Sequence, residues 1–139
     1  MQRMAVIKVR RSMSQHENNQ VNVFVVDDEP MLLEVAKMIL EPLGYSVQTF
    51  RDADLALAAY QSAKPKPELV MTDFSMHTMS GMDFIRECRR LEPRQKIILV
   101  SGTVDETIYA RSSIKPDRFL AKPYLPNQLS EMVRELLNA

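Results

Sequence analysis

Short apolar runs alternate along the chain with longer segments in which apolar and polar residues are mixed. The short runs are rich in Val, Ile, Leu and Phe, and several of them lack the polar alternation of a half-exposed strand. We therefore expect strands whose two faces are both covered by other parts of the protein. The runs predict five strands, at residues 21–26, 46–50, 68–72, 96–100 and 117–121.

The segments between these runs have the apolar spacing of amphipathic helices. Their apolar side chains recur at positions i, i+3, i+4 and i+7, which places them on one helix face. The stripes are Leu32, Val35, Ala36, Ile39, Leu40 and Leu43; then Ala53, Ala56, Leu57 and Tyr60; then Phe84, Cys88 and Leu91; and finally Leu129, Met132, Val133 and Leu136. A less periodic segment, residues 104–114, is interpreted as the helix before the last strand.

Local signals mark where several of these helices begin and end. Asp52 is a predicted N-cap, because its carboxylate can accept hydrogen bonds from the free backbone N–H groups of the first turn. Pro42 and Gly44 mark the end of the first helix, and Pro93 closes the third. We also expect Cys88 and most of the ten methionines to pack in the core rather than to do chemistry.

The strict alternation of strands and helices predicts an α/β fold. It indicates a doubly wound, five-stranded parallel sheet with right-handed crossovers and helices on both faces. Residues 21–139 are predicted to form this single domain, and residues 1–20 a mobile, basic N-terminal tail. In sheets of this kind, ligands bind beyond the carboxyl ends of the strands.

The composition adds limits rather than a function. The chain of 139 residues is 45% hydrophobic and 26% charged, which is typical of a globular domain. Lys plus Arg and Asp plus Glu are equal at 18 each, so no net field favours nucleic acid or membranes as partners. The apolar runs are too short to cross a bilayer, and the single Cys88 excludes an internal disulfide. We expect a cytoplasmic protein; an organelle transit peptide is the less favoured interpretation of the Arg-rich start.

Charged and polar side chains follow four of the predicted strands. Asp27 and Asp28 follow the first, Asp73 the third, Ser101 the fourth and Lys122 the fifth. Two like charges about 4 Å apart repel by roughly 4 kcal/mol at an effective dielectric near 20, so the carboxylates need a partner. A cation, a proton or water could each supply it. Because the carboxyl ends of parallel strands lie at one edge of the sheet, these residues are predicted to converge there.

Oxygen ligands and an ammonium at one sheet edge fit phosphoryl transfer. Mg²⁺ binds through one or two carboxylates together with waters and phosphate oxygens, so it would offset the repulsion. A carboxylate can also accept a phosphoryl group covalently. A metal, a lysine and a hydroxyl would then stabilise the oxygens of the group in transfer.

Four motifs make the chain resemble the receiver domains of two-component response regulators. They are VVDDEP, MTDFSMHTMSG, LVSG and FLAKPY, and the resemblance extends from residue 21 to about residue 137. The resemblance implies a (βα)5 flavodoxin-like fold and a role in phosphorelay signalling. It also implies Mg²⁺ as the cofactor, and a histidine kinase or histidine phosphotransfer protein as the donor of the phosphoryl group.

The resemblance implies a role for each motif residue. Asp73 would be the phosphoacceptor and would bind Mg²⁺ together with Asp28 and the backbone carbonyl of Ser75, while Asp27 would reach the ion through water. Lys122 would pair with the acceptor or with a phosphoryl oxygen. Ser101 would be the switch hydroxyl, where Thr is commoner, and Phe119 would be the switch aromatic. Ser75 and Thr103 would flank the path of the water that hydrolyses the aspartyl phosphate. The bond between Lys122 and Pro123 would be cis.

The chain departs from the family pattern at two places. His77 stands four residues after Asp73, where the family usually has proline, and we interpret it as a tolerated exposed substitution rather than a functional base. The sequence SSIKPDR replaces the usual Gly-Ala before the last strand. This change affects the expected geometry of the output face around residues 104–114, but not the expected phosphorylation site.

Two other classes of protein fit the motifs less well. A metal-dependent aspartyl phosphatase of the haloacid dehalogenase type needs a second Asp two residues after the nucleophile, where this chain has Ser75. A flavodoxin-like cofactor binder cradles phosphate after the first strand with hydroxyls and N–H groups, whereas the sequence DDEP would repel it. We therefore predict a signalling switch that catalyses only its own phosphorylation and dephosphorylation.

The signal is expected to leave through contact with a downstream protein, because no output domain follows the last helix. A homodimer could form through the face made by residues 104–114, residues 117–121 and the final helix. Direct binding to nucleic acid or to a membrane is not expected. The chain is either a free-standing receiver or the receiver module of a larger hybrid histidine kinase.

Overall fold

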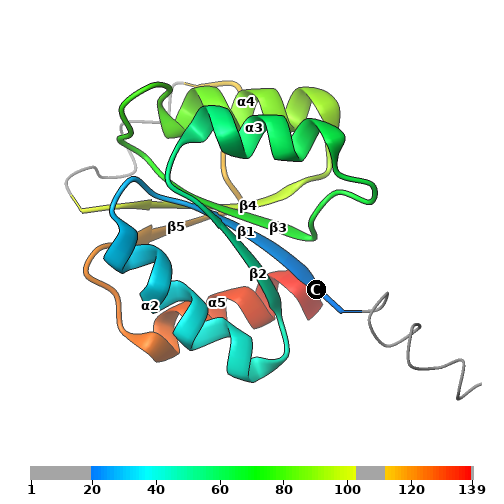
Figure 1. Cartoon of the computed structure of the whole chain (residues 1–139). Helices are drawn as coiled ribbons and strands as arrows, with labels where there is room; N and C mark the ends of the chain where they lie inside the picture. The colour runs from blue at the N-terminus through cyan, green and yellow to red at the C-terminus, as the bar shows by residue number, and fades with distance from the viewer. Residues whose placement is uncertain (1–19, 103–111, 139) are drawn as a thin grey trace, which may run out of the picture.

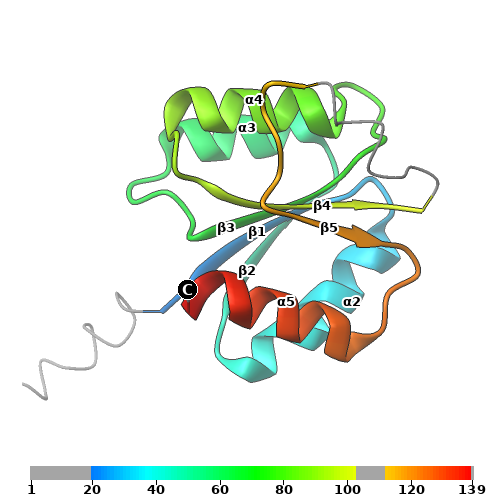
Figure 2. The same ribbon diagram turned by 180° about the vertical axis from the view of Figure 1, so that it is seen from behind.

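A five-stranded parallel sheet lies between two layers of helices (Figure 1). The computed structural model describes residues 20–102 and 112–138. The strands are β1 (Asn22–Val26), β2 (Ser46–Phe50), β3 (Leu69–Asp73), β4 (Lys96–Ser101) and β5 (Arg118–Ala121), in the order β2-β1-β3-β4-β5. Helices α2 (Pro30–Leu40) and α5 (Pro126–Asn138) cover one face, and α3 (Ala53–Ser62) and α4 (Gly81–Leu91) cover the other (Figure 1 and Figure 2). The predicted doubly wound α/β fold is confirmed.

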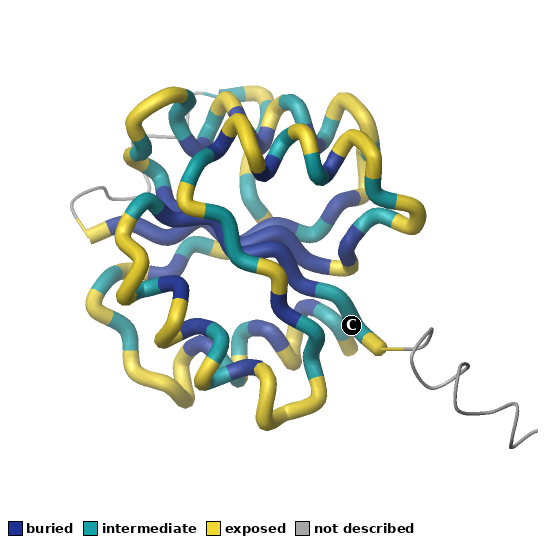
Figure 3. Tube along the Cα trace, in the orientation of Figure 1, coloured by how far each residue is buried: buried dark blue, intermediate teal, exposed yellow. Residues whose placement is uncertain are grey.

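The three central strands, β1, β3 and β4, are buried because helices cover both faces of the sheet, whereas the edge strands β2 and β5 are partly exposed. In β1, Val23 and Val25 belong to the core cluster on the α2 and α5 side, whereas Phe24 and Val26 belong to the cluster on the α3 and α4 side. Figure 3 shows the result, a sheet that is buried at its centre and lies between helices whose outer sides are exposed. Burial on both faces explains why the strands lack polar alternation in the sequence.

The helices begin where the sequence supplies suitable residues. Oδ1 of Asp52 accepts hydrogen bonds from two backbone N–H groups of the first turn of α3, at 2.7 and 3.4 Å, so its predicted N-cap role is confirmed. The hydroxyl of Ser80 accepts a hydrogen bond of 3.1 Å from the N–H of Asp83 at the start of α4. Helix α2 begins at Pro30, where a missing N–H leaves no helical hydrogen bond unmade.

A short 3₁₀ helix, η1 (Glu41–Leu43), follows α2 and leads to β2. Gly44 comes after it with a φ of 101°, in the left-handed region where a side chain would cause strain. The N–H of Gly44 donates to the carbonyl of Glu41 at 3.0 Å. Pro42 lies within η1, so the end of the first helix predicted from Pro42 and Gly44 is confirmed.

The predicted strands agree with the observed strands to within one residue at each end. The main difference is in β3, which contains Asp73 as its last residue instead of ending before it. The tail predicted at residues 1–20 and the helix predicted at residues 104–114 lie almost wholly outside the described part of the chain. Among the described residues, no helix has both the length and the apolar character needed to cross a membrane.

Three apolar positions of the predicted stripes do not lie in the core. Val35, Leu43 and Leu91 are all exposed. The buried residues of α2 are Leu33, Ala36 and Leu40, so its buried face is narrower than the stripe and leaves Val35 at the edge. Leu43 belongs to η1, a 3₁₀ helix that follows α2 and has no buried residues.

Cys88 and most of the described methionines pack in or against the core, as predicted, and two methionines are exceptions. Cys88 is buried as predicted, and burial raises the pKa of its thiol to about 12. Met71 also lies in the core, and Met76, Met79, Met82 and Met132 are partly buried against it. Met31 and Met38, in contrast, are 77% and 71% exposed on α2, because they lie on the side of that helix that faces neither the sheet nor α5.

Candidate functional site

The carboxyl ends of the strands bring the predicted site residues to one edge of the sheet. Asp73 ends β3 and is paired in register with Val100, so Ser101, the last residue of β4, lies one step further along. Asp27 directly follows β1, and Lys122 directly follows β5. The strand-end rule applied to the sequence therefore holds in the structure.

Lys122 is the centre of the site. Its Nζ lies 3.0 Å from Oδ1 of Asp73 and 3.1 Å from Oδ2 of Asp27. A third oxygen, Oε1 of Glu29, lies 3.5 Å away. The side chains of Lys122 and the two aspartates are at most 15% exposed, so salt screens their ion pairs little. The expected proximity of Lys122 and Asp73 is observed, and Glu29 is a partner of the lysine that sequence reasoning missed.

Three carboxylates crowd together beside this lysine. Asp27, Asp28 and Asp73 each offer an oxygen atom within 4.8 Å of the other two. Like charges at that separation repel by roughly 3 kcal/mol at an effective dielectric of 20, and a single ammonium does not balance three of them. A hard divalent cation that prefers carboxylate oxygens fits such a group of ligand atoms.

Burial and charge act in opposite directions on the two central groups. Burial raises the pKa of the Asp73 carboxyl, and the hydrogen bond from Lys122 offsets this only in part. Burial lowers the pKa of Lys122, but its hydrogen bonds to Asp73 and Asp27 outweigh that effect, so the pKa of the ammonium is raised. Lys122 therefore remains protonated at neutral pH, whereas the negative charge of Asp73 is less stable here than in water.

Gly81 allows the end of β3 and the start of α4 to approach each other closely. A Cβ atom at this position would lie 2.2 Å from the carbonyl oxygen of Asp73 and 3.0 Å from Cα of Phe74. The N–H of Gly81 donates to the carbonyl of Phe74 at 2.8 Å and closes the loop between the two elements. We missed this role in the sequence, where the only signal was a glycine just before the apolar stripe of the helix.

The remaining predicted residues lie around this centre. Ser101 is buried at the end of β4, and its carbonyl accepts a hydrogen bond of 2.9 Å from the N–H of Lys122. Phe119 on β5 is half-buried against the core cluster on the α3 and α4 side. Ser75 is exposed in the loop after β3, and the bond between Lys122 and Pro123 is cis, as predicted.

The loop after β3 also brings His77 to the acidic cluster. Its Nε2 lies 3.4 Å from Oδ2 of Asp28, although the imidazole is 88% exposed. The neighbouring hydroxyl of Thr78 donates to Oδ1 of Asp52 at 3.4 Å and ties the loop to the start of α3. His77 is thus exposed, as we expected, but it also contacts a residue of the site. Thr103, the other residue expected to flank the water path, lies outside the described residues.

Two hollows reach the site from different sides. One, of about 720 Å³, is lined by Asp28, His77 and residues of α2, α3 and β2. The other, of about 400 Å³, is mostly apolar and lies between Lys122, Tyr124 and Val35. The first hollow is wide enough for a hydrated ion to approach Asp28, and the second borders Lys122 with apolar side chains.

A doubly wound parallel sheet with acids and a lysine at the carboxyl ends of its strands defines an α/β domain whose site is suited to a phosphoryl group and a metal ion. Within that class, the chain belongs to the response regulator receiver domain family, which matches residues 23–134. Members of this family act in two-component phosphorelay signalling. The matched range contains every residue that we assigned to the site.

Curated relatives are consistent with this family. The chain is 30% identical over 127 residues to the probable transcriptional regulatory protein TcrX of Mycobacterium tuberculosis, a match that covers 90% of this chain and 53% of TcrX. It is 29% identical over 117 residues to the chemotaxis protein CheY of Thermotoga maritima, a match that covers 82% of this chain and 95% of CheY. The chain thus spans about half the length of TcrX and of the regulator SphR of Synechococcus elongatus.

Solved structures show the same fold. The CheY-like receiver domain protein from Methanospirillum hungatei JF-1 is 26% identical, with a TM-score of 0.79 over 86% of this chain and 95% of that chain. The receiver domain of a signal transduction histidine kinase from Syntrophus aciditrophicus is also 26% identical, with a TM-score of 0.75 over 85% and 90% of the two chains. The predicted (βα)5 receiver fold is confirmed.

Proposed function

We propose that this chain is a phosphorylation switch that accepts a phosphoryl group on Asp73 from a phosphohistidine donor. The observation that carries the proposal is the position of the Asp73 carboxylate, which lies 3.0 Å from Nζ of Lys122 and within 4.8 Å of ligand atoms on Asp27 and Asp28. A fold gains nothing from three crowded carboxylates. A nucleophile that must take up a phosphoryl group beside a cation requires such an arrangement.

The residues present fit Mg²⁺ as the cofactor. Asp28, Asp73 and the backbone carbonyl of Ser75 would hold the ion, and Asp27 would reach it through water. These are oxygen ligands, as Mg²⁺ prefers, and they leave room for the waters that the ion keeps. When bound, the ion neutralises charge on the phosphoryl oxygens and on the carboxylates that Lys122 alone does not balance.

The transfer would rely on placement and charge. A carboxylate oxygen of Asp73 forms a bond to phosphorus, the P–N bond to the donor imidazole breaks, and the imidazole keeps the electron pair and takes up a proton. Lys122 remains protonated and donates to the acceptor or to a phosphoryl oxygen. Water later attacks phosphorus, which returns the carboxylate and inorganic phosphate.

A protein donor fits the surface next to Lys122. Met31, Val35 and Met38 on α2 and Leu125 before α5 are exposed apolar residues, which we call the α2 apolar surface. The hollow of about 400 Å³ joins Val35 of this surface to Lys122. A histidine kinase or histidine phosphotransfer protein would cover these residues while its phosphohistidine faces the acidic cluster.

The signal would leave through a change of surface at the other side of the site. Ser101 lies one register step beyond the residue paired with Asp73, so its hydroxyl would move toward a phosphate there, together with Gly102. Phe119, half-buried on β5, would then turn further into the core. Phosphorylation would thus bias a two-state element that a downstream protein or a second copy of the chain reads in the cytoplasm.

Phosphorylation at Asp73 can be tested with acetyl phosphate and Mg²⁺, with mass spectrometry to count and map the added groups. We expect one phosphoryl group on Asp73 in the wild type, none when Mg²⁺ is chelated, and none in Asp73→Asn. Asp54→Asn removes an exposed aspartate from the first turn of α3 and should label like the wild type. Full labelling of Asp73→Asn, or a modified residue elsewhere, would overturn the assignment.

A further inference from the structure

The Lys122 ammonium contacts three carboxylates, and that of Glu29 differs from the other two because it is exposed. Its Oε1 lies 3.5 Å from Nζ of Lys122, and its side chain is 65% exposed, against 8% for Asp27 and 9% for Asp73. The two buried aspartates also lie closer to the nitrogen, at 3.1 and 3.0 Å. The ammonium therefore has two ion pairs without Glu29, which adds a further negative charge on the solvent side of the site.

The backbone of Glu29 is held beside the site by hydrogen bonds at both of its polar groups. Its N–H donates to Oδ1 of Asp27 at 2.9 Å, while Oδ2 of the same carboxylate contacts Lys122. Its carbonyl accepts hydrogen bonds from the N–H groups of Leu32 and Leu33 in the first turn of α2, at 3.0 and 3.3 Å. Asp27 thus links the lysine to the backbone of Glu29, so the exposed carboxylate stays near the ammonium.

Helix capping does not account for the direction of this side chain. Glu29 is the N-cap residue of α2, a position where short side chains such as Asp, Asn, Ser and Thr accept hydrogen bonds from the first turn. Within the described part of the chain, the Glu29 side chain accepts no such hydrogen bond. Its carboxylate contacts Lys122 instead, so its charge is directed to the site rather than to the helix that it begins.

The Glu29 carboxylate lies close enough to the acceptor to repel an incoming phosphoryl group. Because Lys122 contacts both residues, Oε1 of Glu29 and Oδ1 of Asp73 are at most about 6.5 Å apart. Charges at this distance repel each other even in water, and the repulsion grows in proportion to the negative charge of the donor. Salt screens this repulsion, because the Glu29 carboxylate is exposed to solvent.

We propose that Glu29 selects between phosphoryl donors by their charge, so that a doubly negative donor is disfavoured relative to one with a single net negative charge. The inference rests on the proposed phosphorylation of Asp73 and adds a donor preference to it. Acetyl phosphate is a dianion at neutral pH, whereas phosphoramidate carries a protonated nitrogen and a single net negative charge. A phosphohistidine resembles phosphoramidate, because its imidazole ring can also carry a proton. Glu29 thus favours a phosphohistidine donor over acetyl phosphate.

Labelling rates with the two small donors, followed by mass spectrometry of the full chain at one neutral pH with Mg²⁺ and low salt, test this inference. We expect Glu29→Gln to raise the rate constant for labelling of Asp73 about fourfold with acetyl phosphate and about twofold with phosphoramidate. The ratio of the two rate constants should therefore about double. In about 1 M salt, the change with acetyl phosphate should fall below about 1.5-fold, because the Debye length is then about 3 Å.

The Glu29→Gln variant separates charge from hydrogen bonding, because its amide oxygen can still accept from Lys122 and the backbone hydrogen bonds remain. Glu41→Gln is the matched control, since it removes the same charge from an exposed residue at the other end of α2, roughly 18 Å away. It should leave the ratio of the rate constants unchanged. Glu29→Lys reverses the charge and should raise the ratio further than Glu29→Gln.

Equal ratios in the wild type and Glu29→Gln would overturn the inference. A change in the ratio that persists in about 1 M salt would do the same, because it would show altered geometry rather than charge. In either case, labelling of Asp73 would leave the proposed function intact. A wild-type chain that takes up no phosphoryl group on Asp73 from either donor would overturn both proposals.

Discussion

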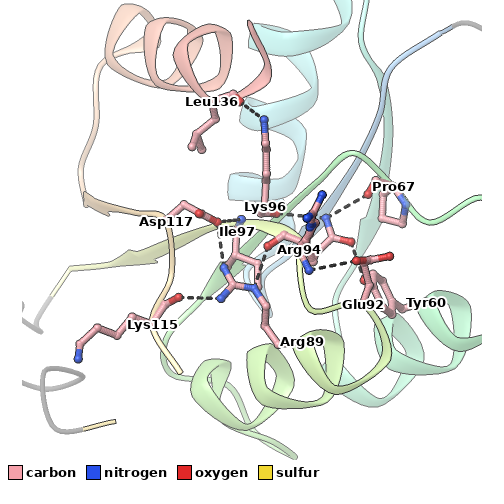
Figure 4. Close-up of polar contacts among 11 residues, drawn as sticks. Tyr60, Pro67, Arg89, Glu92, Arg94, Lys96, Ile97, Lys115, Asp117 and Leu136 are labelled. Carbon is pink, nitrogen blue, oxygen red and sulfur yellow. Dashed lines mark hydrogen bonds and ion pairs between the residues drawn. The ribbon is translucent and has the colours of Figure 1, made fainter. Parts of the chain in front are cut away.

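Charged groups are balanced at the amino end of the sheet and unbalanced at its carboxyl end. At the amino end, Arg89 of α4 donates to the carbonyls of Gln95 at 2.8 Å and Lys115 at 3.1 Å (Figure 4). Its third hydrogen bond, of 2.9 Å, goes to Oδ2 of Asp117, which also accepts one of 2.7 Å from the N–H of Ile97. One cation meets one carboxylate at this end, and each has further hydrogen-bond partners.

The buried polar groups beside this ion pair are also satisfied. Oε1 of Gln95 accepts a hydrogen bond of 2.5 Å from the hydroxyl of Tyr60, and its Nε2 donates to the carbonyl of Pro67 at 3.0 Å. Burial raises the pKa of Tyr60 far above its usual value, so the hydroxyl keeps its proton and remains a donor. A matched set of donors and acceptors of this kind stabilises a fold and has no capacity left for a ligand.

The carboxyl end has the opposite balance. Asp27, Asp28, Asp73 and Glu29 bring four carboxylates near the single ammonium of Lys122. The excess negative charge costs stability unless a cation arrives. The comparison teaches that imbalance, rather than the number of polar contacts, separates a site that binds a ligand from a network that holds a fold together.

The largest expected change in stability comes from a side chain at Gly81, which would block the close contact between the end of β3 and the start of α4. Gly81→Ala places a Cβ against the backbone of Asp73, so the start of α4 must move and the free energy of unfolding should fall by about 3 kcal/mol. Gly102→Ala is the control, because its Cβ would find its nearest atom at 3.5 Å and should change stability by less than about 0.5 kcal/mol. Urea denaturation measures both. Equal stability of the two variants would show that the approach is not a constraint.

A smaller loss is expected from the balanced network at the amino end. Arg89→Leu removes three hydrogen bonds and leaves Asp117 without its cation, so the free energy of unfolding should fall by about 1–3 kcal/mol. Arg86→Leu breaks an exposed ion pair with Asp83 on the same helix and should cost less than about 0.5 kcal/mol. If both substitutions cost the same in urea denaturation, the amino-end network does not hold the fold in the way described.

Removing a carboxylate from the crowded end should have the opposite sign. Without a divalent cation, Asp28→Asn relieves repulsion and should raise the free energy of unfolding by about 1 kcal/mol. Mg²⁺ at ten times its Kd should stabilise the wild type by about 1.4 kcal/mol and the variant by much less. Thermal unfolding with and without Mg²⁺ measures both effects. A destabilised Asp28→Asn in the absence of metal would contradict the idea of an unbalanced site.

The smallest expected effect is a change in the pH dependence of stability. The pKa of Asp73 is raised above 3.8 in the folded chain, so the folded state holds its proton more tightly than the unfolded state does. Its contribution to stability is therefore complete below pH 3.8 and is lost as the pH rises through the raised pKa. Asp73→Asn cannot ionise, so its stability relative to the wild type should increase over that window.

This difference can be measured by urea denaturation at a series of pH values with divalent cations chelated. Asp54→Asn, at an exposed position, is the matched control and should follow the pH dependence of the wild type. A constant stability difference between Asp73→Asn and the wild type across the window would contradict the raised pKa of the acceptor.

The contrast between the two ends was only half predictable from the sequence. Apolar runs show where strands end, and in a parallel sheet all carboxyl ends of the strands lie at one edge. The sequence alone therefore predicted that Asp27, Asp73 and Lys122 lie together. The amino-end network carried no such signal. Arg89 and Asp117 are 28 residues apart, and only the packing of α4 beside the entry to β5 brings them together.

Other parts of the site depend on features that periodicity does not report. The approach of Gly81 to Asp73 is a contact between backbones, and nothing in the residue types indicates its distance. The contact of His77 with Asp28 depends on the path of a loop. Val35 fits a helical stripe yet is exposed, because the stripe shows which side of α2 is apolar but not how much of that side other elements cover.

The strand order also governs how the chain can fold. Val23 of β1 pairs with both Val47 of β2 and Leu69 of β3, and every pair of neighbouring strands is parallel, so a long stretch of chain separates the two strands of each pair. The entropy of closing these connections must be lost before any strand pairing is gained, so we expect the helices to form before the sheet. During synthesis, the apolar β1 therefore waits without a neighbour until β2 and β3 have been made, which is the period when aggregation competes with folding.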